Sequence, residues 1–197
     1  MRLFSFHTLF SFLLLAGLLS CKQHYKYPRV LIKTSLGEIE AELYPDKAPL
    51  TVAAFLSYVD SGYYDRTSFY RVLNTDNQPS YAPKAEIIQG GLYGTANKPK
   101  QLPGIPHEST KQSGLKHLAG TLSMARLEPG TASSEFFICL EDQPGFDYGG
   151  ENNPDKQGYA AFGRVLKGMD VVRKIYNRPE YEQSFDPPIP IVSISRE

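Results

Sequence analysis

Frequent turn-forming residues divide this chain into short segments, and this constrains its fold more than any other feature. Fifteen prolines and sixteen glycines are spread through 197 residues, and both residue types favour turns over the interiors of long helices. Thirteen tyrosines and eleven phenylalanines supply large side chains for a core. The composition therefore favours short strands joined by turns over a bundle of long helices.

Eight segments have the apolar content, or the alternation of apolar and polar residues, that is typical of strands. The clearest is Glu38 to Leu43, in which glutamates alternate with apolar residues and are expected to face water. The eight segments are residues 30–32, 38–43, 68–73, 87–90, 120–124, 136–140, 160–165 and 189–194. An open sheet of short strands would expose its edges, so the pattern indicates a closed antiparallel barrel.

Two other segments have helical spacing. Apolar residues recur at helical intervals between Pro49 and Gly62, which predicts a helix that lies on the sheet. A second helix is expected over residues 168–175, and the last strand is expected to follow a turn at Pro187-Pro188. The length of the chain suits one folded domain, which we expect over residues 29–197.

Charge and composition argue against several classes of function. The 21 Lys and Arg residues balance the 21 Asp and Glu residues, and no basic stripe is present, so no nucleic-acid partner is expected. His107 and His117 stand in expected loops without the carboxylate or cysteine partners that metal ligation requires, and the acidic residues of the segment 141–158 do not match calcium-loop spacing. We therefore expect no metal site and no cofactor. Because no long heptad run occurs, we expect a monomer.

The first twenty residues have the features of a leader peptide. Arg2 provides a positive start, and the apolar run that follows is too short to span a bilayer. The segment Leu18-Leu19-Ser20-Cys21 resembles the lipobox of bacterial lipoproteins, so we expect residues 1–20 to be removed and Cys21 to be lipidated. Residues 21–28 would then tether the domain to a membrane of the cell envelope, outside the cytoplasm. The alternative is a secretory leader that leaves Cys21 free.

One arginine stands among apolar residues in an expected strand. Arg71 lies within the run from Ser68 to Leu73, and no obvious nucleophile accompanies it. A guanidinium stays protonated at ordinary pH and offers a rigid set of donors, so it can bind a lone pair or a carbonyl without giving up a proton. A site built on this residue is suited to twisting a bond.

Five ordered blocks, spread from about Val30 to Val192, resemble the cyclophilin family of peptidyl-prolyl cis-trans isomerases. The blocks are Phe69-Tyr70-Arg71-Val72, Gln89-Gly90-Gly91, residues 120–125 (GTLSMA), residues 134–138 (SEFFI) and residues 161–169 (AFGRVLKGM). The resemblance implies a mainly β fold, with a closed eight-stranded antiparallel barrel capped by two α-helices. It also implies isomerisation of Xaa-Pro bonds in proline-containing polypeptide clients, which for a lipoprotein would be exported or envelope proteins.

The resemblance also implies roles for individual residues. Arg71 matches the catalytic arginine, which would donate to the amide nitrogen as the bond twists. Phe137, Ile87 and Phe146 match an apolar slot for the proline ring. The substrate-binding positions as a whole are Ile87, Gln89, Ala125, Arg126, Glu135, Phe137, Phe146 and Tyr159.

Five positions depart from the usual pattern of the family. Phenylalanine is usual where this chain has Glu86, and asparagine where it has Arg126. Glutamine, tryptophan and histidine are usual where it has Glu135, Gly145 and Tyr159. A carboxylate at position 135 could pair with the catalytic arginine and orient it, or could occupy its donors. Two alternatives to an active isomerase therefore stay open: a module that binds proline-bearing segments with little catalysis, and an envelope lipoprotein that uses the barrel as a scaffold.

Overall fold

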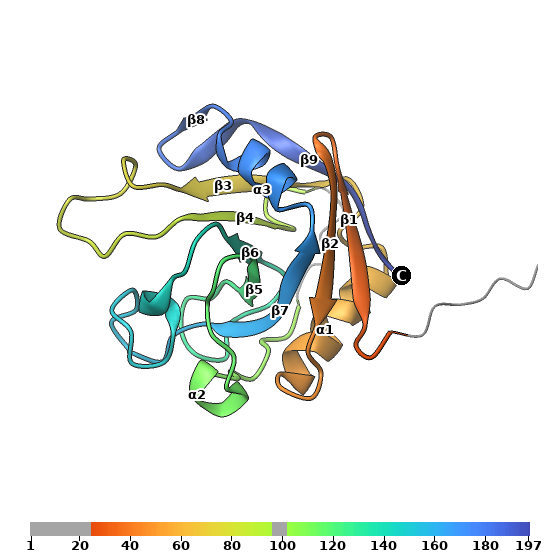
Figure 1. Ribbon diagram of the computed structural model, residues 1–197, viewed down its shortest axis with the longest axis horizontal. Coiled ribbons are helices and arrows are strands. Elements are labelled where there is room, and N and C mark those ends of the chain that lie inside the picture. Colours follow the sequence, from red (N-terminus) through yellow and green to blue (C-terminus); the bar gives the residue numbers. More distant parts are fainter. Residues whose placement is uncertain (1–24, 96–101) are drawn as a thin grey trace, which may run out of the picture.

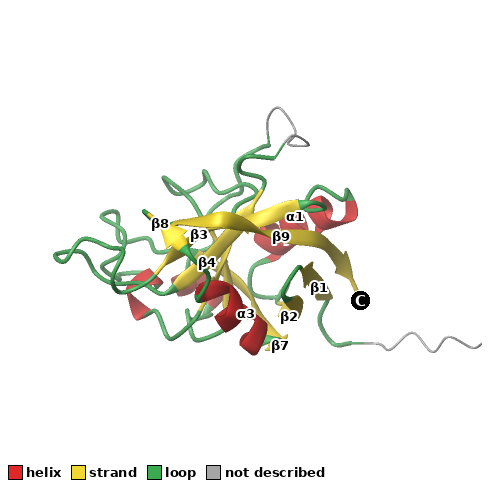
Figure 2. Cartoon of the chain, turned by 90° about the horizontal axis from the view of Figure 1, so that it is seen from above, coloured by secondary structure: helices red, strands yellow, loops and turns green. Residues whose placement is uncertain are grey.

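The sheet of this protein closes on itself. A computed structural model describes residues 25–95 and 102–197, so the expected leader and Cys21 lie outside the described residues. The strands around the ring are β1 (Arg29–Thr34), β2 (Gly37–Leu43), β7 (Ala160–Lys167), β5 (Thr121–Met124), β6 (Phe136–Cys139), β4 (Ile87–Gly91), β3 (Thr67–Leu73) and β9 (Ser184–Arg196). Every neighbouring pair is antiparallel, and β9 pairs with β1 to complete the circle (Figures 1 and 2). The predicted closed eight-stranded antiparallel barrel is confirmed.

The helices lie around this barrel. Both predicted helices are present, as α1 (Pro49–Asp60), which packs against β9 and β7, and α3 (Met169–Tyr176), which packs against β2 and β4. The described residues also contain α2 (Thr110–Ser113) and a 3-10 turn over Pro144–Phe146. One turn of helix is too short to produce a hydrophobic period, which is why two helices were expected and three are found. No helix in the described ranges is long and apolar enough to cross a membrane.

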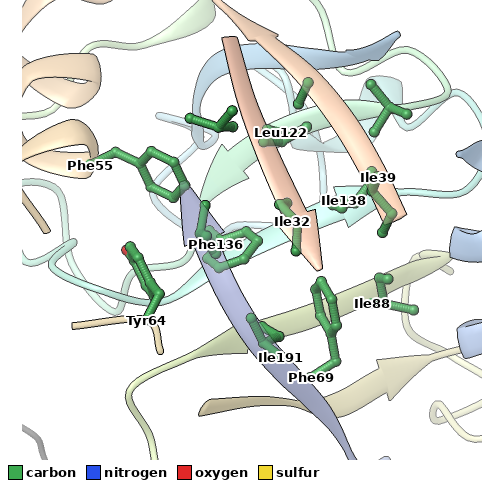
Figure 3. Packing of buried hydrophobic residues seen from close by; sticks show 14 of the residues in the cluster. Ile32, Ile39, Phe55, Tyr64, Phe69, Ile88, Leu122, Phe136, Ile138 and Ile191 are labelled. Carbon is green, nitrogen blue, oxygen red and sulfur yellow. The ribbon is translucent and has the colours of Figure 1, made fainter. Parts of the chain in front are cut away.

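The interior of the barrel is filled by aromatic and aliphatic side chains (Figure 3). Phe136 on β6 has no exposed surface. Its ring centroid lies 5.5 Å from that of Phe55, 5.6 Å from that of Tyr64 and 5.8 Å from that of Phe69, all in edge-to-face contact. A core packed in this way leaves no room for a ligand inside the barrel.

Alternation along the strands creates a second apolar cluster on the outside of the barrel. On β6, Phe136 and Ile138 belong to the interior, whereas Phe137 and Cys139 belong to an outer cluster that also contains Ile87 of β4. Successive side chains of a strand point to opposite faces, so one strand contributes to both clusters. The outer cluster is therefore a product of strand geometry.

Two details of the expected strands are wrong. Glu40 on β2 is buried, because Arg29 and Lys167 each place a nitrogen 2.7 Å from its carboxylate. Pro187 and Pro188 lie within β9 and do not precede it. On one side of the two prolines, residues 189–191 of β9 pair with Thr67 to Phe69, and on the other side Ser184 pairs with Arg71. Neither Pro187 nor Pro188 pairs with β3, so the ladder requires no N–H from them.

A β8 strand (Glu180–Tyr181) extends the sheet beyond the ring. It pairs with the start of β9, as Glu180 opposite Phe185 and Tyr181 opposite Ser184. The hairpin turn between the two strands contains Glu182 and Gln183, both with positive φ, of 49° and 70°. This hairpin was not predicted, since its strand is only two residues long.

Replacing Phe136 with alanine should destabilise the protein by about 3–5 kcal/mol, because the substitution leaves a cavity among three aromatic rings. The free energy of unfolding in urea measures the effect. Leu166→Ala, at an exposed position of β7, is the matched control and should change stability by less than about 0.5 kcal/mol. A loss below about 1 kcal/mol for Phe136→Ala would show that the core is not packed as described.

Candidate active site

One cavity on the outside of the barrel collects the residues singled out from the sequence. It has a volume of about 530 Å³. The nine residues expected at the site all line it, namely Arg71, Ile87, Gln89, Ala125, Arg126, Glu135, Phe137, Phe146 and Tyr159. Further lining residues come from three loops, those between β3 and β4, between β5 and β6 and between β6 and β7 (Figure 1).

The floor of the cavity is a cluster of aromatic rings. The ring centroids of Phe137 and Phe146 are 5.3 Å apart, those of Phe137 and Tyr159 are 5.3 Å apart, and those of Phe146 and Tyr159 are 5.0 Å apart. All three contacts are edge-to-face, an arrangement that holds the rings in place. Phe137, Phe146 and the adjacent Ile87 have less than a twentieth of their surface exposed. The result is a rigid apolar surface of the kind that accepts a small ring.

A β-bulge in β3 directs Arg71 to this cavity. Phe69 pairs with Gly90 and Arg71 pairs with Gln89, so Tyr70 is an extra residue in the β3–β4 ladder. Phe69 and Val72 are both in the interior cluster. Simple alternation cannot place two residues between them on the outer face, but an inserted residue can. The bulge therefore allows Tyr70 and Arg71 to point outward together.

Amide oxygens hold the guanidinium of Arg71. Its Nη1 donates to Oε1 of Gln89 at 3.3 Å, while Nε and Nη2 donate to Oε1 of Gln183 at 3.2 and 2.7 Å. Among the described residues, no carboxylate lies within ion-pair distance of Arg71. Glu135 therefore neither pairs with Arg71 to orient it nor occupies its donors, the two possibilities raised by the sequence.

Glu135 instead orders the second layer of the site. Its Oε2 accepts a hydrogen bond of 2.8 Å from the hydroxyl of Tyr70, and its Oε1 accepts 2.9 Å bonds from Leu92 N and Ser134 Oγ. A side chain at Gly91 would collide with this carboxylate, so the second glycine of the Gln-Gly-Gly block is required here. Burial, followed by the charge of Glu135, raises the pKa of the Tyr70 phenol, which stays protonated.

A chain of hydrogen bonds connects the two layers. Gln89 accepts from Arg71 through Oε1 and donates through Nε2 to the Tyr70 hydroxyl at 2.6 Å, and that hydroxyl donates to Glu135. Because the phenol donates its only proton to the carboxylate, it can only accept from Gln89, and this fixes which end of the Gln89 amide faces Arg71.

The side chain of Arg126 is committed to the protein. Only 1% of it is exposed, and its Nη1 and Nη2 lie 2.7 and 2.9 Å from the two oxygens of Asp155. Its Nε donates to Gly158 O at 2.9 Å. The bond from Arg126 lowers the pKa of Asp155 to about 2. Any contact between Arg126 and a bound peptide would therefore use its main chain.

The space at Gly145, where the family usually has a tryptophan, is occupied by Asn152. A Cβ at Gly145 would collide with Oδ1 of Asn152, and Nδ2 of the same residue donates to Pro83 O at 3.1 Å. This bond joins the β3–β4 loop to the β6–β7 loop. The wall of the cavity is thus formed by a polar bridge in place of a large ring.

Glu86 is another position that departs from the family pattern. It accepts a hydrogen bond from Tyr176 at 2.8 Å and does not line the cavity.

The expectation that His117 lacks a carboxylate partner is wrong. Its Nδ1 lies 2.9 Å from Oδ1 of Asp147, and its Nε2 lies 3.0 Å from Oγ of Ser123. Since a carboxylate only accepts, the Nδ1 of a neutral His117 carries the proton and Nε2 accepts from the Ser123 hydroxyl. Ser123 is fully buried, so it cannot reach a substrate as a nucleophile. The imidazole stacks at 6.1 Å behind Phe137 and supports the floor of the cavity.

Sequence reasoning missed several contributors to the site. Gln183 lies more than a hundred positions from Arg71 along the chain, and nothing in its surroundings indicates a role. Tyr70 was part of a recognised block, but its hydrogen bonds depend on the bulge. No three histidine, cysteine or acidic side chains come together as a metal site in the described part of the chain.

Comparisons with known proteins agree with this architecture. A family model described as "Cyclophilin type peptidyl-prolyl cis-trans isomerase/CLD" matches residues 29–196. A peptidyl-prolyl cis-trans isomerase of Acinetobacter baylyi is 40% identical over 168 residues, which cover 85% of this chain and 81% of that protein. Peptidyl-prolyl cis-trans isomerase B of Escherichia coli is 37% identical over 147 residues, covering 74% of this chain and 82% of the relative.

Solved structures show the same relationship. A cyclophilin-type peptidyl-prolyl cis-trans isomerase from Cryptosporidium parvum superposes with a TM-score of 0.68 at 25% identity, covering 87% of this chain and 98% of the other. The chain therefore belongs to the cyclophilin-type peptidyl-prolyl cis-trans isomerases. It is an enzyme of that class, whose members act on proline-containing peptides, and the resemblance drawn from the five sequence blocks is confirmed.

Stability should fall on acidification through His117. Burial, only partly offset by Asp147, lowers the pKa of this imidazole below the ordinary value of 6.5. The unfolded chain therefore binds a proton at a higher pH than the folded protein does. The contribution of neutral His117 to the free energy of unfolding is complete above pH 6.5 and is lost as the pH falls through the folded-state pKa. Urea unfolding at a series of pH values from about 7.5 to about 5 measures the decline.

His117→Asn removes the titrating group and provides the comparison. The variant should be less stable by about 1–3 kcal/mol at neutral pH, because buried partners lose hydrogen bonds. Its stability should depend less steeply on pH in the same range. Equal slopes for the two proteins would contradict the assignment.

Proposed function

We propose that this isomerase acts by stabilising a twisted Xaa-Pro amide with the guanidinium of Arg71. Rotation about the amide bond crosses a barrier of about 18–20 kcal/mol because it breaks the resonance of the C–N bond. A twisted amide has a pyramidal nitrogen with a localised lone pair, whereas in a planar amide that pair is delocalised into the carbonyl group. A fixed donor aimed at that nitrogen therefore binds the transition state more tightly than either ground state.

The contacts of Arg71 are the observation that carries this proposal. Only neutral amide oxygens hold its guanidinium, and no carboxylate of the described residues neutralises it. A guanidinium held in this way keeps its full charge for the ligand. This favours catalysis over the alternative of a binding module, in which the arginine would need only to fill space.

The apolar floor supplies the other requirement of the reaction. A proline ring seated on Phe137 and Phe146 would be fixed while the preceding carbonyl rotates. Arg71 and Gln89 line the same cavity as this floor, so a rotating amide bound there would have both the donor and the floor within reach. A structural neighbour at 26% identity and a TM-score of 0.67, covering 86% of this chain and 98% of that chain, was solved in the presence of the dipeptide Ala-Pro. The use of that dipeptide supports the same class of substrate here.

We further propose that the protein works as a lipid-anchored monomer in the bacterial cell envelope, where it assists the folding of exported proteins. The lipobox-like segment ending at Cys21 supports the anchor. The domain matched by the family begins at residue 29. The short segment after Cys21 would be long enough to separate a globular domain from a membrane surface without fixing its orientation.

Arg71→Ala should lower kcat/KM for a proline-containing peptide by about a hundredfold or more, because it removes the donor aimed at the twisted amide. A protease-coupled or NMR exchange assay on the purified domain measures the rate. Arg71→Lys keeps the charge but loses the fork of donors and should fall between the two. The exposed Arg178→Ala is the control and should retain full activity. An Arg71→Ala variant as active as the parent would reject the mechanism.

Cys21→Ala should release the protein from the membrane fraction when it is expressed with its leader. The parent protein should be recovered with membranes, and mass spectrometry should find acyl chains on Cys21. A parent protein that is exported but soluble would instead support the alternative of an ordinary secretory leader. Recovery of the alanine variant with membranes would also contradict lipid anchoring.

A further inference from the structure

We propose that Gln183 is a positioning residue that holds Arg71 in place for isomerisation. The inference rests on the role proposed above for Arg71. It assigns part of the catalytic geometry to the β8–β9 hairpin, which lies outside the five sequence blocks.

The contacts between the two side chains are the main evidence. Oε1 of Gln183 accepts hydrogen bonds from both Nε and Nη2 of Arg71, at 3.2 and 2.7 Å. The single bond from Arg71 to Gln89 is longer, at 3.3 Å. Two bonds to one oxygen fix the plane of the guanidinium, whereas a single bond at Nη1 would leave it free to rotate. Gln183 therefore makes the stronger of the two attachments.

Gln183 is itself held in place by its main chain. Its carbonyl oxygen accepts from Val72 N at 2.8 Å, and its own N–H donates to Oε2 of Glu180 at 2.8 Å. Its φ of 70° is in the left-handed region, which non-glycine residues seldom adopt. Backbone conformations of this kind persist where the surrounding structure specifies them, and they are concentrated at functional sites. The neighbouring residue Ser184 pairs with Arg71 in the β3–β9 register, so the backbone keeps Gln183 close to the arginine.

The other end of the Gln183 amide is attached to the wall of the cavity. Nε2 donates to Asn77 O at 3.1 Å, in the loop between β3 and β4. This loop contributes Gln78, Ala82 and Pro83 to the lining of the cavity. Reversing the amide would place two donors, the amide nitrogen and the guanidinium, against each other, so its orientation is determined. One side chain thus links Arg71 to the loop that bounds the substrate cavity.

An inventory of the donors shows what this arrangement leaves for a substrate. A guanidinium has five N–H groups. Gln183 uses the one on Nε and one on Nη2, and Gln89 uses one on Nη1. One N–H on each terminal nitrogen has no partner within the described part of the protein. Since Arg71 lines the cavity, these two groups are available to a twisting amide.

The proposal predicts a loss of rate without a loss of binding. Gln183→Met preserves the length of the side chain, and methionine, like glutamine, is an unbranched L-residue that must adopt the same positive φ. The substitution removes both hydrogen bonds to Arg71. We expect kcat/KM to fall about tenfold, because small misplacements of a catalytic group are costly. The dissociation constant of a proline-containing peptide, measured by titration calorimetry, should change by less than about twofold, since the aromatic floor is intact.

Two further variants separate positioning from general stability. Gln183→Glu keeps an acceptor facing Arg71 but adds a negative charge that would neutralise the guanidinium, so its activity should also fall, while the Nε–H of Arg71 should stay protected from exchange with water. Glu182→Ala, at the exposed neighbouring position of the same turn, is the matched control and should have parental activity. The Nε–H resonance of Arg71 in NMR spectra should shift and exchange faster with water in Gln183→Met, but not in Glu182→Ala.

A double-mutant cycle with Arg71 decides the question. If Gln183 acts through Arg71, then Gln183→Met should cause no additional loss in the Arg71→Ala background. A similar loss in both backgrounds would overturn the inference, as would parental activity of Gln183→Met in a protein that still depends on Arg71. An Arg71→Ala variant with full activity would overturn the proposed mechanism and this inference with it. A failure of the Gln183 role alone would leave the activity dependent on Arg71, so the two failures give different results.

Discussion

Closure of the sheet is the constraint on which the rest of this structure depends. Because β9 pairs with both β1 and β3, the ring has no open edge, and its interior is filled by rings such as Phe69 and Phe136. A filled barrel cannot hold a substrate, so the chemistry must be on its outer surface. Strand alternation supplies that surface, since β6 sends Phe136 inward and Phe137 outward. Core and site are two faces of the same strands.

The β3 bulge departs from this alternation at the one point where the site requires it. With Tyr70 inserted into the ladder, two consecutive polar side chains reach the outer face while Phe69 and Val72 remain in the core. Arg71 then reaches the cavity, and Tyr70 connects Gln89 to Glu135. A strand without the bulge would have to bury one of these polar groups without a partner, which is costly.

The electrostatic arrangement around Arg71 follows a consistent logic. Its immediate partners are the neutral amides of Gln89 and Gln183, and the carboxylate at the end of the chain that runs through Gln89, Glu135, is reached only through Tyr70. The guanidinium is therefore oriented without being neutralised. By contrast, Arg126 forms a bidentate pair with Asp155 and has a structural role. Two arginines that line one cavity thus have different functions because of their partners.

Periodicity was sufficient to predict the strands and both long helices, and so to favour a barrel, because strand alternation and apolar spacing are local properties of the chain. Nine of the residues that line the cavity were predicted from the resemblance of the five ordered blocks to the cyclophilin family. Contacts between distant segments were not predictable in this way. Gln183 meets Arg71 only because β9 pairs with β3, and His117 meets Asp147 only because two loops converge. Such contacts depend on register, bulges and loop paths, which are settled when the whole chain packs. Residue types therefore indicated the chemistry, while tertiary packing decided which partners orient it.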